Sequence, residues 1–229
     1  MISDLGVIIA AGGSSQRYGS RDKLLEDLAG IPVFLHSIRA FLPVIAPGNM
    51  VIAVRKEALE EFRRLTDGFL PGNTIRWVSG GADRVESVKN ALAALPLTSG
   101  LVAIHDAARP LATAQLLEKV AEYARRCGGA VAASKVVDSL KLADDTGLIV
   151  SPVARDRMFC AETPQVFDIE KYRIACDKLA GAVPTDDAEI MRLAGFPVVL
   201  VESGQLNCKL TAPEDLLKLR QLLRGVSNG

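Results

Sequence analysis

The chain has 229 residues, of which 27 are Lys or Arg and 27 are Asp or Glu, and 49% of its residues are hydrophobic. This length and composition predict one full-sized α/β domain with its own core. The even charge balance argues against general nucleic-acid binding, which requires a basic face. No apolar run approaches the roughly 20 residues of a membrane span, so we expect no membrane contact. Four scattered cysteines predict neither a zinc site nor a disulfide framework, and we expect a cytoplasmic, reducing location.

Short apolar runs alternate along the chain with segments of helical period. The expected strands are 5–10, 50–54, 74–78, 101–105, 130–134 and 198–201, and the expected helices are 32–46, 56–65, 83–95, 113–126, 169–179 and 213–223. This alternation predicts a Rossmann-like, mostly parallel twisted sheet with helices on both faces. Ligands of such sheets lie beyond the carboxyl ends of the strands. We therefore expect the polar loops that follow residues 10, 78 and 105 to meet in one crevice.

A protruding β-arm is expected where the alternation breaks, at about residues 136–160. Two short β-like stretches flank the sequence DDTG at 144–147, which is typical of a hairpin turn. An isolated two-stranded hairpin is marginally stable in water, so we expect the arm to pack on a second copy of the chain. The alternative is an ordinary surface hairpin. Residues 1–229 are thus interpreted as a single domain with a dimerisation arm.

The loop after the first strand, AAGGSSQRYGSRDK at 10–23, is rich in glycine. Its spacing fits neither the G-x-G-x-x-G of dinucleotide-binding loops nor the P-loop, in which Ser or Thr follows the lysine. Glycines allow the backbone to approach a ligand closely, main-chain N–H groups can form an anion nest, and Arg17 and Lys23 add positive charge. These features favour a polyphosphate ligand. The alternative is a surface turn beside solvated cations.

A second glycine turn, SGGADRVESVKN at 79–90, precedes a predicted helix. Ser87 lies one helical turn from Arg84, on the same side of the helix. Backbone groups and a hydroxyl could read the edge of a nucleotide base. The alternative is a plain strand–helix turn capped by Asp83.

The loop IHDAARP at 104–110 follows the fourth predicted strand. Asp106 can bind Mg²⁺, which takes carboxylate and phosphate oxygens, and Arg109 can hold a second anionic group. A turn-forming role is the alternative for Asp106. His105 is a candidate general base, but a packed, hydrogen-bonded histidine is the favoured interpretation.

Two later cations are also candidates for ligand binding. Arg155 lies at the end of the arm and Lys209 lies in QLNCKLTAPED. Each could instead be a solvated surface charge. The acidic pair in TDDA, 185–188, is interpreted as a helix cap with acids in the first turn.

Taken together, AAGGSSQR, GGADRVESV, HDAARP, VVDSLK, ETPQVF, TDDA and NCKLTAPEDL closely resemble the 2-C-methyl-D-erythritol 4-phosphate cytidylyltransferase family. The resemblance covers nearly the whole chain, and HDAARP and the lysine-containing tail are its most specific parts. It implies a homodimer with interlocked β-arms, a Mg²⁺ cofactor and a role in the non-mevalonate route of isoprenoid biosynthesis. The implied reaction transfers CMP from CTP to 2-C-methyl-D-erythritol 4-phosphate and releases pyrophosphate, by in-line attack of the substrate phosphate on the α-phosphorus.

The resemblance also implies a role for each matching residue. The residues implied to be catalytic are Arg17, Lys23 and Lys209. Those implied to bind CTP are Ala10, Ala11, Gly12, Gly13, Gly81, Arg84, Ser87 and Asp106, with Asp106 as the metal ligand. Those implied to bind the sugar phosphate are Arg109, Ser139, Arg155 and Lys209, with Ser139 and Arg155 supplied by the partner's arm. The chain departs from the family's usual P-K-Q at Asp22-Lys23-Leu24.

Three other functions compete with this interpretation. A cytidylyltransferase for ribitol 5-phosphate or a related pentitol phosphate would need almost the same phosphate-binding groups. A dinucleotide-dependent oxidoreductase would need G-x-G-x-x-G and an acid after the second strand, where Arg55 stands instead. A catalytically silent dimeric partner would not need the retained charges of the glycine loop and the tail.

Overall fold

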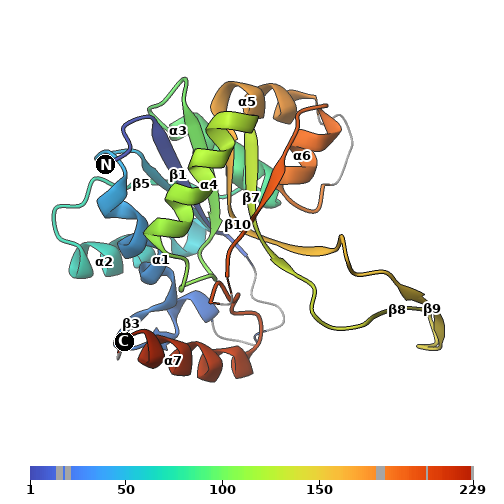
Figure 1. Ribbon diagram of the computed structural model, residues 1–229. Helices are drawn as coiled ribbons and strands as arrows, with labels where there is room; N and C mark the ends of the chain where they lie inside the picture. The colour runs from blue at the N-terminus through green and yellow to red at the C-terminus, as the bar shows by residue number, and fades with distance from the viewer. Residues whose placement is uncertain (14–17, 19–21, 179–183, 205, 228–229) are drawn as a thin grey trace.

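A seven-stranded sheet forms the centre of the computed structural model, which describes residues 1–13, 18, 22–178, 184–204 and 206–227 (Figure 1). The strand order is β11-β7-β10-β6-β1-β4-β5. The strands are β1 Leu5–Ala11, β4 Met50–Val54, β5 Arg76–Ser79, β6 Leu101–Asp106, β7 Gly129–Lys135, β10 Phe159–Asp168 and β11 Val199–Glu202. All neighbouring pairs are parallel except those of β10, which runs antiparallel to both β6 and β7. The predicted mostly parallel α/β fold is confirmed.

Helices cover both faces of the sheet. Those packed on one face are α1 Val33–Phe41, α2 Leu59–Phe69 and α4 Ala114–Cys127, and those on the other are α3 Arg84–Ala94, α5 Ile169–Asp177 and α6 Asp187–Leu193. Side chains alternate between the faces of a strand, so Val7 and Ile9 of β1 belong to the first core layer and Ile8 belongs to the second. The unbroken apolar runs of the sequence are explained by this burial on both sides.

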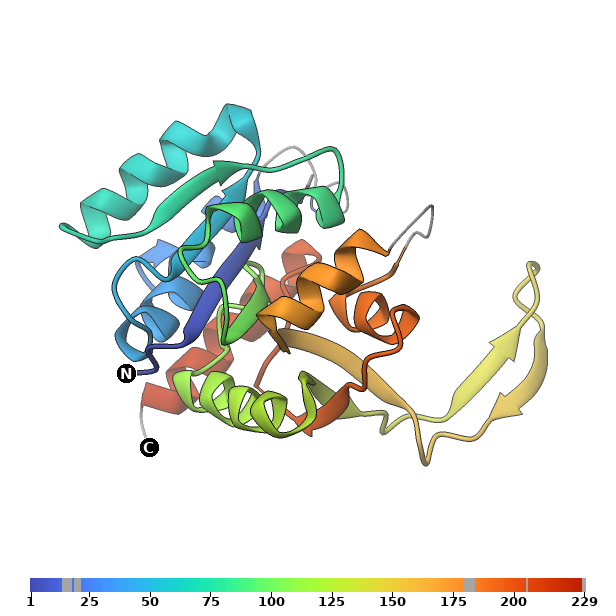
Figure 2. The same cartoon turned by 90° about the horizontal axis from the view of Figure 1, so that it is seen from above.

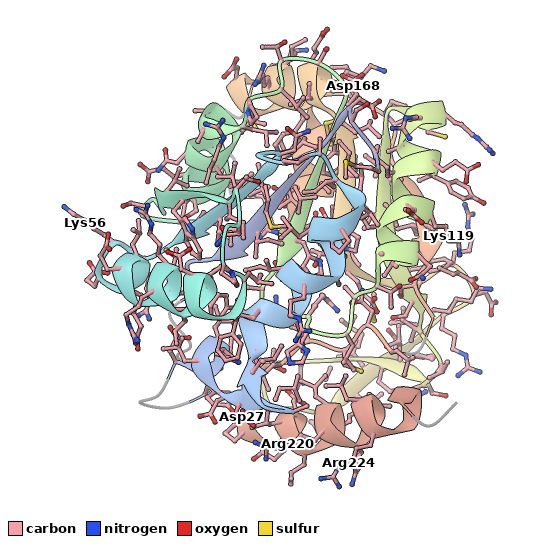
Figure 3. The ribbon with its side chains drawn as sticks, turned by 90° about the vertical axis from the view of Figure 1, so that its left-hand side faces the viewer. Asp27, Lys56, Lys119, Asp168, Arg220 and Arg224 are labelled. Carbon is pink, nitrogen blue, oxygen red and sulfur yellow. The ribbon has the colours of Figure 1, made fainter. Side chains whose placement is uncertain are left out.

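A last helix, α7 Pro213–Ser227, packs against the small hairpin of β2 Asp27–Leu28 and β3 Ile31–Pro32. The Arg220 guanidinium donates a hydrogen bond to the Asp27 carbonyl at 2.8 Å (Figure 3). Residues 208–210, which precede this helix, are thereby brought back towards the carboxyl edge of the sheet, where the Leu210 N–H donates to the Ala108 carbonyl at 2.8 Å.

The structure differs from the sequence prediction at several places, and two of them have a clear physical reason. The helix expected over 32–46 ends at Phe41 and continues as a 3-10 turn, Leu42–Val44, because Pro43 has no N–H to continue the helical hydrogen bonds. The strand β10 was not expected. Its sequence is interrupted by Glu162, Thr163 and Gln165, which are polar but buried, so its apolar pattern is too weak to predict a central strand.

The arm is present as the antiparallel pair β8 Leu140–Ala143 and β9 Ile149–Val153. It projects away from the sheet and helices (Figure 2). In its turn the Asp144 carboxylate accepts hydrogen bonds from the N–H groups of Thr146 and Leu148, and Gly147 takes a φ of 86° that favours glycine. None of the helices in the described ranges has the length and apolarity needed to cross a membrane.

Candidate active site

A cavity of about 350 Å³ lies at the carboxyl ends of β1, β5 and β6. The glycine loop after β1, the turn after β5 and the loop after β6 all reach it, as the sequence predicted. Its lining residues are Ala10, Gly12, Gly13, Lys23, Leu24, Gly81, Ala82, Asp83, Arg84, Ser87, Asp106, Ala108 and Lys209. Most of the residues predicted to be catalytic or to bind CTP are therefore brought together.

Asp106 is the centre of the charge network in this cavity. Its Oδ2 accepts a hydrogen bond from Lys209 Nζ at 2.6 Å, and its Oδ1 lies 3.3 Å from an Arg84 nitrogen. The Asp106 N–H donates to the Thr163 hydroxyl at 3.0 Å, which fixes the backbone at the end of β6. Burial alone raises the pKa of Asp106, but the charges of Lys209 and Arg84 outweigh it and hold that pKa well below its usual range. The carboxylate is ionised at neutral pH.

Arg84 connects this network to the second layer of helices. It is the first residue of α3, whose N-terminus is capped by the Asp83 carboxylate, 2.8 Å from the Glu86 nitrogen. Its guanidinium also pairs with Asp187, which is fully buried at the start of α6. Burial lowers the pKa of Arg84, but the two carboxylates more than compensate and raise it above its ordinary value.

Asp187 is a residue of this site that sequence reasoning missed. The sequence predicted a helix cap at TDDA, and Asp186 is that cap, because its carboxylate accepts the Glu189 N–H at 2.9 Å. Asp187 instead pairs with Arg84, which lies 103 positions earlier in the chain. The sequence did contain a signal for a second role: Asp186 and Asp187 are adjacent, and one acid is enough to cap a helix.

The Ser87 side chain stabilises the turn after β5 through two hydrogen bonds to the main chain of that turn. The Ser87 hydroxyl accepts a hydrogen bond from the Gly81 N–H at 3.0 Å and donates one to the Asp83 carbonyl at 2.7 Å. A Cβ atom at Gly80 would lie 2.9 Å from the same hydroxyl oxygen, so glycine is required there by close approach. Ser87 therefore shapes the turn, and the main chain of that turn faces the cavity.

Lys23 opens a 3-10 turn, Lys23–Leu25, beside the cavity. The Asp22 carboxylate caps this turn by accepting the Leu24 N–H at 3.0 Å. A second oxygen of Asp22 accepts a hydrogen bond from the Arg55 guanidinium at 2.7 Å, and Leu24 is buried in the core. The backbone around Lys23 is thus anchored on both sides. Arg17, the other predicted cation of this loop, lies outside the described residues.

His105 is fully buried and does not line the cavity. Its Nδ1 lies 3.1 Å from the Thr163 hydroxyl oxygen, and its Nε2 lies 3.2 Å from that of Ser37. Burial lowers the pKa of His105 to about 4, so the ring is neutral at pH 7. The favoured interpretation of a packed, hydrogen-bonded histidine is confirmed.

Other predicted site residues of the chain lie away from the cavity. Ala11 is buried in the core. Arg109 donates to the Asn207 carbonyl at 2.7 Å and lies 4.0 Å from Glu162, so its charge is already matched by a carboxylate. Ser139 and Arg155 lie on the arm, where the Arg155 guanidinium donates to the Val137 carbonyl. Within one chain, the structure does not bring these four side chains to the cavity.

The cavity carries one carboxylate suited to a magnesium ion. No group of three or more His, Cys, Asp or Glu side chains within the described ranges could hold a metal by itself. Mg²⁺ bound with a nucleotide takes one or two protein carboxylates and fills its other positions with phosphate oxygens and water. Asp106, which is ionised and lines the cavity, fits that requirement.

The fold and the site together define a nucleotidyltransferase. The glycine loop after β1, the turn after β5 and the cations Lys23, Arg84 and Lys209 all line one cavity at the carboxyl edge of the sheet. These are the parts that such an enzyme needs to hold a nucleoside triphosphate. The chain belongs to the IspD family of 2-C-methyl-D-erythritol 4-phosphate cytidylyltransferases, whose family model matches residues 5–224.

Individual relatives agree with this assignment. The chain is 32% identical to the 2-C-methyl-D-erythritol 4-phosphate cytidylyltransferase of Dehalococcoides mccartyi strain CBDB1, with 96% of each chain covered. It is 34% identical to that of Shouchella clausii, with 97% of each covered. Among solved structures, the cytidylyltransferase of Thermus thermophilus superposes with a TM-score of 0.80 at 29% identity, covering 96% of this chain and 98% of the other.

Proposed function

We propose that the cavity at the carboxyl edge carries out the reaction of the family, the transfer of CMP from CTP to 2-C-methyl-D-erythritol 4-phosphate with release of pyrophosphate. The observation that supports this location is that Arg84 and Lys209 both pair with the Asp106 carboxylate in a cavity that Lys23 also lines. The glycine turns after β1 and β5 lie on the same cavity and offer main-chain groups to the phosphates and the base.

The chemical obstacle in this reaction is repulsion between anions. The substrate phosphate is already a nucleophile at neutral pH, so no general base has to remove a proton. Catalysis then depends on alignment of the two substrates and on positive charge at the α-phosphorus. His105 is neutral and buried behind the cavity. This placement is consistent with a reaction that uses no general base.

Lys23 and Lys209 supply this charge in the proposal, together with Arg17 of the glycine loop. The Lys209 side chain is 39% exposed and its Nζ is held at 2.6 Å by Asp106. Asp106 thereby keeps an ammonium group ready at the cavity before the nucleotide arrives. The resemblance of the loop and tail motifs to the family supports the same three cations.

Asp106 would hold Mg²⁺ in the nucleotide-bound enzyme. The bound ion would neutralise charge on the triphosphate. The residue's own part is to present an ionised carboxylate from a backbone that the Thr163 hydroxyl holds rigidly.

The active enzyme is proposed to be a homodimer in which Ser139 and Arg155 of the partner subunit complete the sugar-phosphate site. Exposed apolar side chains on the arm support this assembly: Leu148, Ile149 and Val150 are 70%, 66% and 62% exposed. Burial of such side chains against another surface is favourable by about 1.5–3 kcal/mol each. The four cysteines are free thiols, which supports a reducing, cytoplasmic location.

The decisive experiment measures pyrophosphate release from CTP, with 2-C-methyl-D-erythritol 4-phosphate and ribitol 5-phosphate as parallel acceptors and with and without Mg²⁺. We expect release with the first acceptor and a requirement for the metal. Preference for ribitol 5-phosphate would replace the proposed acceptor, and full activity in a chelator would remove the metal from the proposal.

The dimer is tested separately by Ile149→Asp, measured by analytical ultracentrifugation. The introduced charge should shift the chain towards the monomer. An unchanged dimer would show that the arm is not the contact.

A further inference from the structure

A buried carboxylate behind the cavity wall has no part in the chemistry described so far. Asp187 has no exposed surface. Its Oδ1 accepts a hydrogen bond from the Tyr172 hydroxyl at 2.5 Å, and its Oδ2 accepts one from the Arg84 guanidinium. An ionised carboxylate in the interior is costly unless a cation and hydrogen bonds match it. Of these three residues, Arg84 lines the cavity.

The local structure of α6 does not require this carboxylate. Asp186 caps the helix, and its second oxygen accepts a hydrogen bond from Gln165 at 3.0 Å. Asp187 follows the cap and points inward between α5 and α3, where its contacts are Tyr172 and Arg84. Its effect is therefore exerted on the neighbouring helices, and α5 and α6 lie side by side in the fold (Figure 1).

Arg84 is held by two carboxylates that differ in their surroundings. Asp187 is fully buried, whereas the Asp106 side chain is 15% exposed and 3.3 Å from the guanidinium. Asp106 also accepts from Lys209 and is the residue proposed to hold Mg²⁺. If Asp106 binds another partner, Asp187 remains as the carboxylate that pairs with Arg84.

We propose that Asp187 is a positioning residue for the nucleotide. It keeps the Arg84 guanidinium at the cavity wall independently of Asp106, so that Arg84 stays in place to contact CTP while Asp106 exchanges its partners. Asp187 acts through Arg84 and does not touch the nucleotide. The inference rests on the proposed function insofar as CTP is the ligand, but the hold on Arg84 is a property of the protein alone.

The first test therefore uses the nucleotide-free protein. Guanidinium N–H groups that are fixed by buried carboxylates exchange slowly with water, so NMR of ¹⁵N-arginine-labelled protein should resolve the signal of Arg84. Arg84→Lys assigns that signal by its loss. We expect the signal to persist in Asp106→Asn and to disappear in Asp187→Asn. Its loss in Asp106→Asn, or its persistence in Asp187→Asn, would overturn the proposal.

The second test measures CTP binding by calorimetry. Loss of a charged hydrogen bond of this kind should raise the Kd of CTP roughly 10- to 100-fold in Asp187→Asn. Tyr172→Phe is the matched control, because it removes the other hydrogen bond of the same carboxylate and keeps the ion pair with Arg84. It should lower the thermal stability and leave the Kd of CTP unchanged. An equal weakening of CTP binding in both variants would assign the effect to general destabilisation and overturn the proposal.

A double-mutant cycle separates positioning from other effects of Asp187. In an Arg84→Ala background, Asp187→Asn should cause no additional loss of CTP affinity, and a further tenfold loss would contradict the proposal. If Asp187→Asn alone does not fold, the cycle cannot be completed and the Asp106→Asn spectrum decides the question, because loss of the Arg84 signal in that variant would overturn the proposal. CTP binding without any turnover of the sugar phosphate would contradict the proposed function and leave the role of Asp187 intact.

Discussion

The residues around the cavity and those on the arm differ in how they are held in place. Arg84, Asp106 and Lys209 come from distant parts of the sequence and are joined by ion pairs within one chain. Ser139 precedes and Arg155 follows the hairpin of β8 and β9. This hairpin projects from the body (Figure 2), and its apolar side chains Leu148, Ile149 and Val150 are exposed. The comparison shows that folding of one chain is enough to bring the cavity residues together, whereas the sugar-phosphate half, as proposed, would need association of two chains.

Lys23→Ala should have the largest effect, because it removes a charge from the cavity itself. Loss of one well-placed charged donor is worth roughly 3–4 kcal/mol, so we expect kcat to fall by about two to three orders of magnitude with a smaller change in KM. Steady-state pyrophosphate release measures this. The exposed Lys56, beside α2 at the edge of the molecule (Figure 3), provides the control, since Lys56→Ala should retain the kcat of the unmodified chain. A near-normal kcat in Lys23→Ala would remove this lysine from the transition state.

The pH dependence of stability tests the burial of His105 behind the cavity. Burial lowers the pKa of His105 to about 4 from 6.5, so the unfolded chain binds a proton at higher pH than the folded one does. Stability should be constant above about pH 6.5 and should fall as the pH drops towards 4, by about 3 kcal/mol in the free energy of unfolding. Urea unfolding of His105→Gln should show a shallower decline over this range. The remaining decline would come in part from His36, whose pKa is also lowered by burial. If the free energy of unfolding of His105→Gln fell equally steeply between pH 6.5 and 4, protonation of His105 would not be the cause of the decline.

Arg155→Ala tests the arm side of the comparison. Removal of a charged hydrogen bond to a phosphate is worth about 1.5–3 kcal/mol, so the KM for the sugar phosphate should rise at least tenfold while the KM for CTP changes little. Arg157, another exposed arginine of the arm, offers a matched control, and Arg157→Ala should leave both constants unchanged. Equal effects of Arg155→Ala on the two substrates would argue against a sugar-phosphate role.

The smallest effect is expected from the ion pair that anchors the Lys23 turn. The Arg55 side chain is 41% exposed, and Asp22 is 11% exposed. Partly exposed pairs contribute about 0.2–1 kcal/mol, so Arg55→Ala should reduce kcat by no more than a few-fold. In the Lys23→Ala background the same substitution should have no effect on kcat. An undiminished effect in that background would show that Arg55 acts on the reaction by another route.

The sequence alone determined the layered fold and the position of the cavity. Apolar runs alternating with helical periods require a sheet buried on both faces, and polar loops after the parallel strands then meet at one edge. Gly81, Lys23 and Asp106 could therefore be placed at one site before the fold was known, and the cap at Asp83 follows from its position before a helix. Local chemistry was also enough to predict the hairpin of the arm.

Only the tertiary structure decided which charges face one another. The central position of β10, the contacts of His105 with Ser37 and Thr163, and the pairing of Arg84 with Asp187 all depend on residues far apart in the chain. The hydrophobic periodicity of the sequence predicts which side of a helix or strand is buried. It does not predict which residue of another helix or strand packs against that side. The physical reason is that a buried polar group is acceptable only when its hydrogen bonds and charge are matched, and those matches are made by the packing of the whole chain.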